Sequence, residues 1–429
     1  MRDLSCDVLV IGSGPAGLAA AYQARRSGSG RVVLVERNDE LGGILPQCIH
    51  NGFGGRVFQT DLTGPEYASR WIHQAHEVGV EFLSRTMVLS IEPGPSIVAT
   101  GSVCGLVRIE AKALVLAMGC RERTRGALAI PGTRPAGVYT AGTAQRLVNI
   151  EGFMPGERFV ILGSGDIGMI MARRLTLEGA EVAVMVEIMP YISGLRRNLV
   201  QCVRDYDIPL LLCTTVTGVI GRDRVEAVTI SQVDERWQPV PGTQREIPCD
   251  TLLLSVGLIP ENELSRMAGV ALDPLTGGPY VDERLATSVP GIFAAGNVVH
   301  VYDLVDHVTE SALQAGRYAA DYARQGAQEK APIGRLIPLR AGRNVQHVVP
   351  QALHMEALED GEATIEFRVR QPIEASVRAQ ITSGDQVLVS RRLRYARPSE
   401  MVTLSLDLAH AQRAGRAEML RVEVVPSVA

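Results

Sequence analysis

The chain has 429 residues, of which 46% are hydrophobic, so it is long enough for two or three domains with substantial cores. Its formal net charge of −4 provides no basic footprint, which argues against nucleic acid as a partner. No apolar run reaches the roughly eighteen residues that span a bilayer. Glycine and proline interrupt the apolar N-terminal stretch, so we expect neither a signal peptide nor a membrane span, and a cytoplasmic protein.

The first pattern is a strand, a glycine turn and a helix. The apolar run Val8-Leu9-Val10-Ile11 precedes Gly12-Ser13-Gly14-Pro15-Ala16-Gly17, and a helix follows. Glycines in this spacing allow the tight turn, the approach of a pyrophosphate and close packing of helix on strand. The free N–H groups of the helix then face the phosphates. A second strand ends at Glu36, whose carboxylate can accept hydrogen bonds from ribose hydroxyls.

The same pattern returns later in the chain. A strand over 158–162 precedes Gly163-Ser164-Gly165-Asp166-Ile167-Gly168, a helix follows to about Glu178, and a strand over 181–186 ends at Glu187. The number of residues from first glycine to acid is the same in both copies. Two dinucleotide sites in one chain indicate electron transfer between two cofactors.

The second acid bears on the choice of nicotinamide cofactor. A carboxylate at Glu187 binds free ribose hydroxyls and repels a 2′-phosphate, so NAD(H) is favoured over NADP(H). Four arginines keep the alternative open: Arg173, Arg174, Arg196 and Arg197.

The seven cysteines are scattered, and no two form a CxxC or CxxxxC arrangement. This pattern argues against a disulfide framework, a zinc site and an iron–sulfur cluster. Any redox chemistry must therefore come from bound cofactors.

Later segments carry a resemblance to a known family. Thr287-Ser288-Val289-Pro290-Gly291-Ile292-Phe293-Ala294-Ala295-Gly296 resembles the last motif of the two-dinucleotide-binding-domain flavoproteins, the pyridine nucleotide-disulfide oxidoreductase-like superfamily. The resemblance implies an α/β fold with two Rossmann-like nucleotide-binding domains of three-layer ββα/βαβ architecture. The FAD domain would comprise residues 1–118 and 249–330, and the NAD(H) domain residues 119–248.

The resemblance also assigns cofactor contacts to the glycine turns, the acids and the carboxyl ends of later strands. For FAD it implies Gly12, Gly14, Pro15, Ala16, Gly17, Glu36, Arg37, Gly43, Ile44, Val88, Ala117, Gly119, Gly296, Asn297 and Val308. For NAD it implies Gly163, Gly165, Asp166, Ile167, Glu187 and Gly257. The helix from about Asp306 would direct its N-terminus at the flavin, with 303–306 as its cap.

Two departures from the family matter. Asn297 stands where the family usually has Asp, so it can hydrogen-bond a ribitol hydroxyl without adding charge. The loop after Gly43 offers only Cys48, so a dithiol reductase is not expected. Cys48 is a candidate redox thiol, assisted by His50; the favoured alternative is that it packs as a small apolar residue.

A closer resemblance points to FAD/NAD-linked subunits of heteromeric oxidases and dehydrogenases. Segments 118–123, 130–145, 42–54 and 296–306 are similar to those of sarcosine and opine oxidase subunits and of a glycerol-3-phosphate-dehydrogenase-associated subunit. The resemblance implies a partner flavoprotein or redox subunit, and it leaves open whether the chain itself is oligomeric. Five residues fall on segments expected near the flavin: His50, His300, Asp303, Asp306 and His307. They could relay a proton to or from the flavin, or they could make only capping or surface contacts.

The C-terminal part, residues 331–429, changes to short strands of period two. Five strands, over 363–370, 375–381, 386–393, 401–408 and 418–425, predict a small antiparallel sandwich or barrel. We expect it to cover a subunit interface or to act only as a structural cap.

The functional hypothesis is an FAD-dependent, NAD(H)-linked oxidoreductase that exchanges electrons with a partner subunit or small acceptor. Candidate catalytic residues are Cys48, His50 and His307, and no metal site is expected. One alternative is a non-catalytic assembly or electron-relay subunit, favoured by Ile170 where disulfide reductases often have glutamate. A further alternative is an NADH oxidase that reduces oxygen.

Overall fold

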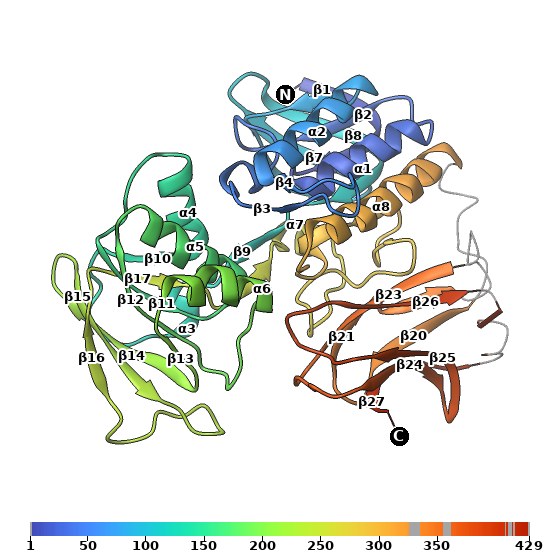
Figure 1. Ribbon diagram of the computed structural model, residues 1–429. Helices are drawn as coiled ribbons and strands as arrows, with labels where there is room; N and C mark the ends of the chain where they lie inside the picture. Colours follow the sequence, from blue (N-terminus) through green and yellow to red (C-terminus); the bar gives the residue numbers. More distant parts are fainter. Residues whose placement is uncertain are drawn as a thin grey trace. The chain divides into compact units, whose positions relative to one another are not determined.

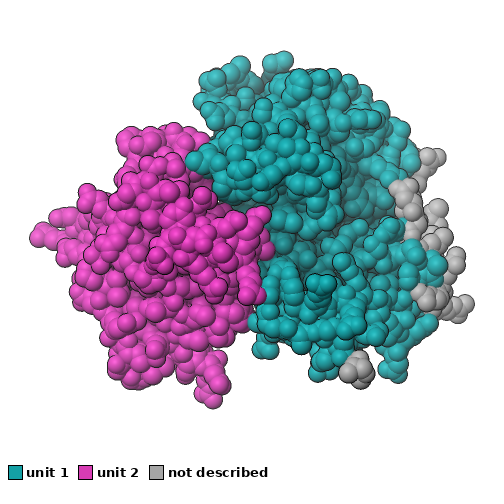
Figure 2. All heavy atoms as spheres, viewed as in Figure 1, with its two compact units in different colours: residues 1–120, 260–429 teal, residues 121–259 magenta. Residues whose placement is uncertain are grey.

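The computed structural model describes residues 2–325, 335–354, 362–407, 409–410, 414 and 417–427. These residues form two compact units, coloured separately in Figure 2. The first unit comprises Met1–Cys120 and Pro260–Ala429, and the second comprises Arg121–Ile259.

The first unit is built on a sheet whose central strand is β1 (Arg2–Ile11). The apolar second half of β1 is buried between its parallel neighbours β2 and β8. One long strand, β8, pairs with β7 along its first half and with β19 along its second half, so the antiparallel meander extends a parallel nucleotide-binding sheet. The other strands of this sheet are β2 (Val32–Val35), β5 (Glu81–Leu83), β6 (Thr86–Glu92), β7 (Ser96–Gly101), β8 (Gly105–Leu116) and β19 (Ile292–Ala294).

Helices α1 (Pro15–Arg26) and α8 (Val305–Gln325) pack side by side against this sheet (Figure 1). Their close approach requires glycine, because a Cβ at Gly316 would lie 2.2 Å from the carbonyl oxygen of Ala20. The remaining elements of this part are η1 (Leu45–Gln47), β3 (Asn51–Phe53), β4 (Leu62–Thr63), α2 (Gly64–Glu77), α7 (Glu263–Met267) and η4 (Gly296–Val298).

The C-terminal residues of the first unit form two sheets that share one apolar core, which we call the C-terminal sandwich. One sheet has the order β22-β20-β27-β24-β25 and the other β21-β23-β26. The five predicted strands are present as β23 (Glu362–Val369), β24 (Val377–Ser383), β25 (Gln386–Leu393), β26 (Val402–Asp407) and β27 (Leu420–Pro426). Three strands were not predicted: β20 (Leu336–Ala341), β21 (Val345–Val349) and β22 (Ala352–His354).

The second unit contains a parallel sheet of order β10-β17-β11-β12-β13 and an antiparallel sheet β14-β15-β16. Its second strand, β17 (Thr251–Leu254), pairs in parallel with β10 and β11. With the expected boundary at residue 248, this strand would belong to the FAD domain, whereas the structure includes it in the second unit. Apolar sequence alone predicts a buried parallel strand but does not identify its neighbours.

The other elements of the second unit follow the repeat seen in the sequence. They are β9 (Cys120–Glu122), α3 (Arg125–Leu128), β10 (Val138–Thr140), α4 (Ala141–Asn149), β11 (Arg158–Leu162), α5 (Asp166–Leu177), β12 (Glu181–Val186), α6 (Arg196–Asn198), η2 (Leu199–Val203), η3 (Arg204–Tyr206), β13 (Leu210–Leu211), β14 (Thr214–Gly221), β15 (Val225–Gln232), β16 (Arg245–Pro248) and β18 (Leu258–Pro260). Across the described residues, no helix is both long and apolar enough to cross a membrane.

Candidate dinucleotide sites

The first glycine turn lies between β1 and α1, at the carboxyl end of the strand. A Cβ at Gly12 would lie 2.5 Å from the carbonyl oxygen of Ala117, and one at Gly17 would lie 1.7 Å from that of Gly12. Gly14 is different, because a Cβ there would meet no protein atom within 4 Å. The protein therefore packs tightly behind the turn and leaves open space in front of Gly14, where a phosphate group fits. The N–H groups of Ala16 and Gly17 belong to the first helical turn, which begins at Pro15 and has no internal acceptors for them.

The acid after β2 is fixed by this turn. Glu36 is buried, and its Oε2 accepts hydrogen bonds from the backbone N–H of Ser13 at 2.9 Å and from the Ser13 hydroxyl at 2.6 Å. Its Oε1 accepts from the N–H of Asn38 at 2.8 Å. A carboxylate held in one position is suited to accept further hydrogen bonds from a ribose.

The second unit repeats this arrangement. Glu187 Oε2 accepts from the Ser164 N–H at 2.9 Å and hydroxyl at 2.6 Å, while Oε1 accepts from the Met189 N–H at 3.0 Å. Ser193 adds a hydroxyl donor to Oε2 at 3.0 Å. The sequence predicts the two acids as ligands. It does not single out the two serines, although Ser13 and Ser164 occupy the same place in both turns.

Each glycine turn also carries a covering loop. The N–H of Gly42 donates to the Ser13 carbonyl at 3.0 Å, and the N–H of Gly194 donates to the Ser164 carbonyl at 3.0 Å. A Cβ at Gly43 would lie 2.8 Å from the Cα of Gly14, so the Gly43 loop packs directly on the first turn. This contact supports the predicted placement of Gly43 beside the phosphate-binding turn.

The helix of the second turn begins at Asp166, whose Oδ1 accepts from the Leu195 N–H at 2.8 Å and from the Asn198 amide at 2.6 Å. Its side chain is therefore engaged within the protein. Behind the turn lies Ser255, which the sequence analysis missed: its hydroxyl accepts from the Gly168 N–H at 3.0 Å. A Cβ at Gly163 would lie 2.1 Å from the Ser255 carbonyl oxygen, so Ser255 corresponds to Ala117 of the first unit.

The segment after β19 reaches the first glycine turn. A Cβ at Gly296 would lie 2.7 Å from the Cβ of Ala16 and 3.2 Å from Cγ1 of Val308, so the start of α8 adjoins the start of α1. Asn297 is engaged within the protein: its Oδ1 accepts from the Tyr302 N–H at 3.0 Å, and its Nδ2 donates to Cys120 Sγ at 3.5 Å. Its expected hydrogen bond to ribitol stays a prediction.

The other predicted contact residues are spread more widely. Arg37 is exposed and Ile44 is half exposed, whereas the side chain of Val88 is buried in the core of the first unit. Gly119 and Gly257 both have positive φ, at 72° and 97°, in the loops after β8 and β17. Pro15 is the first residue of α1, and Ile167 packs against the core of the second unit.

Cys48 packs in the loop that precedes α2. Its side chain is buried, its thiol donates to the Ile44 carbonyl at 3.4 Å, and burial raises its pKa to about 12. A Cβ at Gly64, the first residue of α2, would lie 2.8 Å from the Cβ of Cys48. A neutral, tightly packed thiol is a poor nucleophile, which favours the packing role. Beside it, His50 stacks on Phe53 with ring centroids 5.1 Å apart and has its Nδ1 2.9 Å from the Asn51 carbonyl.

We expect Cys48→Ala to keep NADH-dependent turnover within about twofold of wild type, because no step requires a thiolate with so high a pKa. Dye reduction by the FAD-loaded protein measures this. Cys6→Ala is the matched control, since Cys6 is also buried and its pKa is also raised to about 12 by burial. If Cys48→Ala lost turnover while retaining FAD, and Cys6→Ala did not, the result would favour a redox role for Cys48.

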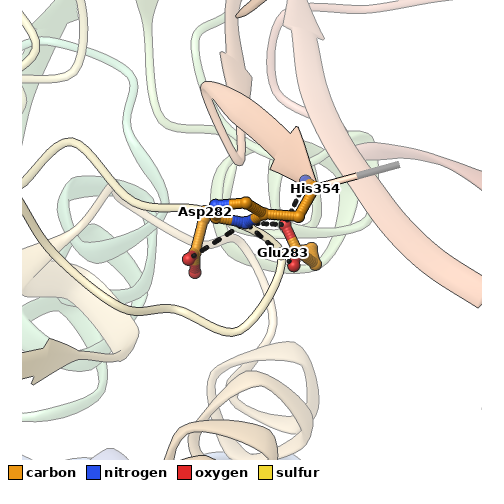
Figure 3. Close-up of side chains that lie close together, drawn as sticks. All are labelled: Asp282, Glu283 and His354. Atoms are coloured by element: carbon orange, nitrogen blue, oxygen red, sulfur yellow. Dashed lines mark hydrogen bonds and ion pairs between the residues drawn. The ribbon is translucent and has the colours of Figure 1, made fainter. Parts of the chain in front are cut away.

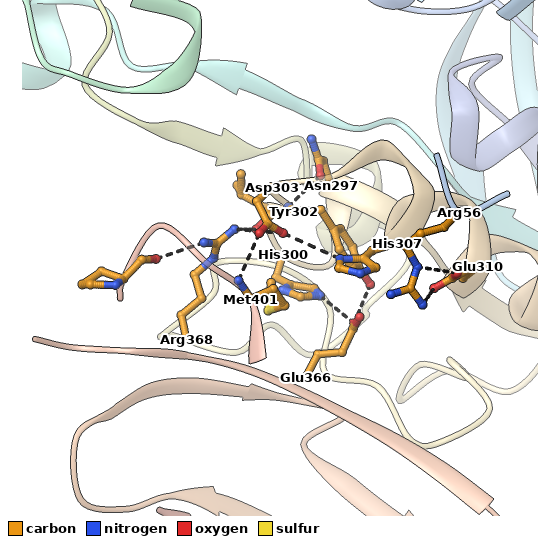
Figure 4. A network of polar contacts seen from close by, with 12 residues as sticks. Arg56, Asn297, His300, Tyr302, Asp303, His307, Glu310, Glu366, Arg368 and Met401 are labelled. Atoms are coloured by element: carbon orange, nitrogen blue, oxygen red, sulfur yellow. Dashed lines mark hydrogen bonds and ion pairs between the residues drawn. The ribbon is translucent and has the colours of Figure 1, made fainter. Parts of the chain in front are cut away.

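A polar network joins the start of α8 to the C-terminal sandwich (Figure 4). The hydroxyl of Tyr302 donates to Oε2 of Glu366 at 2.9 Å, and Nε2 of the buried His300 lies 3.3 Å from the same oxygen. His307 Nδ1 lies 3.7 Å from Oδ1 of Asp303, and the contact with this carboxylate raises the pKa of His307.

The predicted helix cap differs from the structure. Asp303 Oδ2 accepts from the N–H of Met401 at 3.1 Å, and Asp306 Oδ1 accepts from the N–H of Val57 at 3.2 Å. Both acids therefore tie the start of α8 to other segments, which local sequence could not reveal.

A second buried cluster connects the loop around Asp282 to β22 (Figure 3). Nδ1 of His354 lies 3.3 Å from both carboxylate oxygens of Glu283 and 3.6 Å from Oδ2 of Asp282. Arg284 Nε lies 3.5 Å from Glu283 Oε1. Burial, followed by the charge of Glu283, raises the pKa of Asp282 to about 6.

This cluster predicts a pH effect on stability. An acid with a raised folded-state pKa stabilises the fold below its unfolded pKa, and the contribution is lost as pH rises through about 6. Asp282→Asn keeps the oxygen that accepts from the N–H groups of Arg284 and Ala286, and removes the charge. We therefore expect the variant to gain up to about 3 kcal/mol relative to wild type between pH 4 and pH 7.

Thermal unfolding of both proteins across this range measures the effect. Asp385→Asn in the exposed β24–β25 turn is the control, and its pH profile should follow that of wild type. Parallel profiles for wild type and Asp282→Asn would contradict the assignment.

Both turns fit a dinucleotide. Each presents a helix N-terminus, a glycine cradle closed behind by backbone and a buried carboxylate fixed by a serine. The first turn, predicted to hold FAD, in addition adjoins Gly296 and the start of α8.

Comparisons with known proteins show which family the chain is similar to. The sequence profile of the family described as pyridine nucleotide-disulphide oxidoreductase matches residues 6–360. An opine oxidase subunit of Agrobacterium tumefaciens (strain Ach5) is 31% identical over 313 residues, covering 68% of this chain and 61% of that protein. The ferredoxin reductase component of chlorobenzene dioxygenase of Cupriavidus sp. (strain PS12) is 28% identical over 346 residues, covering 77% and 78%.

Among solved structures, thioredoxin reductase of T. acidophilum has a TM-score of 0.61 at 24% identity, covering 75% of this chain and 99% of that one, which shows a shared fold. The chain spans less than two thirds of the length of the opine oxidase subunit.

Proposed function

The chain belongs to the pyridine nucleotide-disulphide oxidoreductase family, and from this premise we propose that it is an FAD-dependent oxidoreductase. It transfers hydride between NAD(H) and FAD and exchanges electrons with a partner subunit or a small acceptor. The cofactors supply the hydride chemistry, and the protein supplies binding, orientation and electrostatics.

The observation that carries the proposal is the duplicated serine–carboxylate cradle, one copy in each unit. Ser13 with Glu36 would hold the ribose of FAD, and Ser164 with Glu187 that of the nicotinamide cofactor. The N–H groups at the starts of α1 and α5 would hold the pyrophosphates. A buried carboxylate at Glu187 favours NAD(H), because a 2′-phosphate would bring two negative groups together.

A dithiol mechanism is not part of the proposal. The sequence places no two of the seven cysteines at CxxC or CxxxxC spacing, and the described part of the chain contains no disulfide. The high pKa of Cys48 supports the same conclusion, since disulfide chemistry requires a thiolate. Electrons would therefore leave for a partner, as the words "component" and "subunit" in the relatives' names suggest. The cytoplasmic location stays a prediction.

The proposal is tested by supplying the FAD-loaded chain with NADH and three kinds of acceptor. We expect rapid reduction of an artificial dye, slow reduction of oxygen and no reduction of an aromatic disulfide. Rapid disulfide reduction would contradict the proposal, and rapid oxygen consumption by the chain alone would favour the NADH oxidase. A chain that holds FAD but never reduces it with NADH would favour the assembly subunit.

A further inference from the structure

The C-terminal sandwich contributes to the first turn of α8, the part of the helix that adjoins the glycine cradle. His307 precedes Val308, whose side chain faces Gly296 at the carboxyl end of β19. Ligands of parallel α/β sheets bind at the carboxyl ends of the strands. The first turn of α8, beside the proposed FAD site, therefore carries two titratable groups, Asp306 and His307. Asp306 accepts from the N–H of Val57, so we consider what fixes the charge of His307.

His307 lies next to Asp303, and both groups are poorly accessible to water. Their side chains are 11% and 8% exposed, and neither Nδ1 of His307 nor Oδ1 of Asp303 has a hydrogen-bond partner in the described part of the chain. Because both atoms are buried, the 3.7 Å contact with Asp303 is the main interaction that favours the protonated form of His307. The position of Asp303 thus decides whether His307 holds a proton.

Asp303 is held from the C-terminal sandwich. Its Oδ2 accepts from the N–H of Met401, the residue before β26. Arg368 on β23 is 13% exposed and lies 3.9 Å from Oδ1 of Asp303. The same guanidinium donates to the carbonyl of Val301 at 3.2 Å and to that of Pro398 at 3.0 Å. Arg368 therefore ties the segment that carries Asp303 to the segment that carries Met401, whose N–H binds the Asp303 carboxylate (Figure 4).

We propose that Arg368 is a positioning residue of the flavin site: by binding the backbone of the segment that carries Asp303 and of the segment that carries Met401, it holds the Asp303 carboxylate against His307 and so fixes a proton on the imidazole in the first turn of α8. This inference rests on the proposed function, because His307 affects electron transfer only if FAD binds beside it. It makes the C-terminal sandwich part of the acid–base machinery rather than a cover alone.

The other charges around His307 agree with this assignment. Burial acts to raise the pKa of Asp303, but His307 and Arg368 outweigh it, so this pKa is lowered. The charge of Glu366 favours protonated His307, while that of Arg56 opposes it. Arg56 forms an ion pair with Glu310 at 3.0 Å, which reduces its influence.

The first test is the pKa of His307, followed by NMR in protein labelled at its eight histidines. In wild type this pKa should lie above the ordinary value. Arg368→Gln should lower it by about 1 pH unit, because Asp303 moves away from the imidazole. Asp303→Asn should lower it at least as far. Arg370→Gln is the matched control: Arg370 directly follows β23 and donates to the Val345 carbonyl, so this change should leave the pKa of His307 as in wild type.

The direction of the shift separates positioning from simple repulsion. If Arg368 acted only as a nearby cation, its removal would raise the pKa of His307, and a raised or unchanged value in Arg368→Gln would overturn the proposal. If Arg368→Gln does not fold, Arg368→Lys keeps the charge but cannot bind both carbonyls, and it should lower the pKa as well. A wild-type pKa at or below the ordinary value would also overturn the proposal.

The second test is the midpoint potential of bound FAD between pH 6 and pH 9, set with a chemical reductant so that NADH is not needed. The plot should change slope at the pKa of His307, and this break should shift to lower pH in Arg368→Gln and disappear in His307→Asn. A break that stays in place in these variants would contradict the link to the flavin. Failure of NADH to reduce FAD would instead contradict the proposed function and leave this result intact.

Discussion

Replacing Gly14 by alanine is expected to weaken FAD binding by about 10- to 100-fold while the apoprotein keeps its fold. The backbone at Gly14 has φ −65°, which alanine adopts without strain, and its Cβ would meet no protein atom within 4 Å. The methyl group therefore costs the protein nothing. It occupies only the space in front of the turn, where the pyrophosphate must approach the backbone.

The measurement is the FAD dissociation constant, taken together with the melting temperature of the apoprotein. Gly126→Ala in the second unit is the control, because a Cβ there meets nothing closer than Thr124 Oγ1 at 3.8 Å, and it should retain wild-type affinity. Gly17→Ala should behave differently and disrupt the turn itself, since its Cβ would lie 1.7 Å from a carbonyl oxygen. Unchanged FAD affinity in Gly14→Ala would contradict the placement of a phosphate group of FAD in front of Gly14.

Glu187→Gln is expected to weaken NADH binding by about 10- to 100-fold and to leave FAD bound. A hydrogen bond to a charged group contributes about 1.5–3 kcal/mol, and the charged carboxylate is lost. The amide also has only one acceptor oxygen, so it cannot accept both from Ser164 and from the N–H of Met189. The preference for NADH over NADPH should fall, because the repulsion of a 2′-phosphate is removed as well.

Isothermal titration with both nucleotides checks this result. Glu181→Gln lies at the other end of β12, in an exposed ion pair with Arg158, and should bind NADH as wild type does. Tighter binding of NADPH than NADH by the wild-type protein would show that the arginines near this site, rather than Glu187, decide the choice.

Much of the architecture could be predicted, because strand, glycine turn, helix, second strand and acid follow one another in the same order in both copies of the repeat. Local periodicity and glycine spacing carry that information, and β11, α5 and β12 lie within one residue of the expected ranges. The neighbours of a strand are less accessible. The apolar run at Thr251–Leu254 belongs to the second unit because it pairs with β10 and β11. The sequence of the run does not indicate which strands it pairs with.

The candidate site shows the same limit. Glu36 and Glu187 follow strands and were recognised, whereas Arg368 is distant in sequence from Asp303 and His307, and its role depends on how the C-terminal sandwich packs. The strands β20, β21 and β22 escaped prediction because they are short and interrupted by Pro338 and Pro350. Contacts of long sequence separation give no local signal.

The central claim is that this chain itself passes electrons from NADH to FAD. It is tested most directly by anaerobic titration of the FAD-loaded protein with NADH, followed by the loss of flavin absorbance. We predict complete bleaching by one equivalent of NADH per flavin and markedly weaker bleaching by NADPH. Flavin absorbance that stays unchanged with excess of either nucleotide, in protein shown to hold FAD, would contradict the claim.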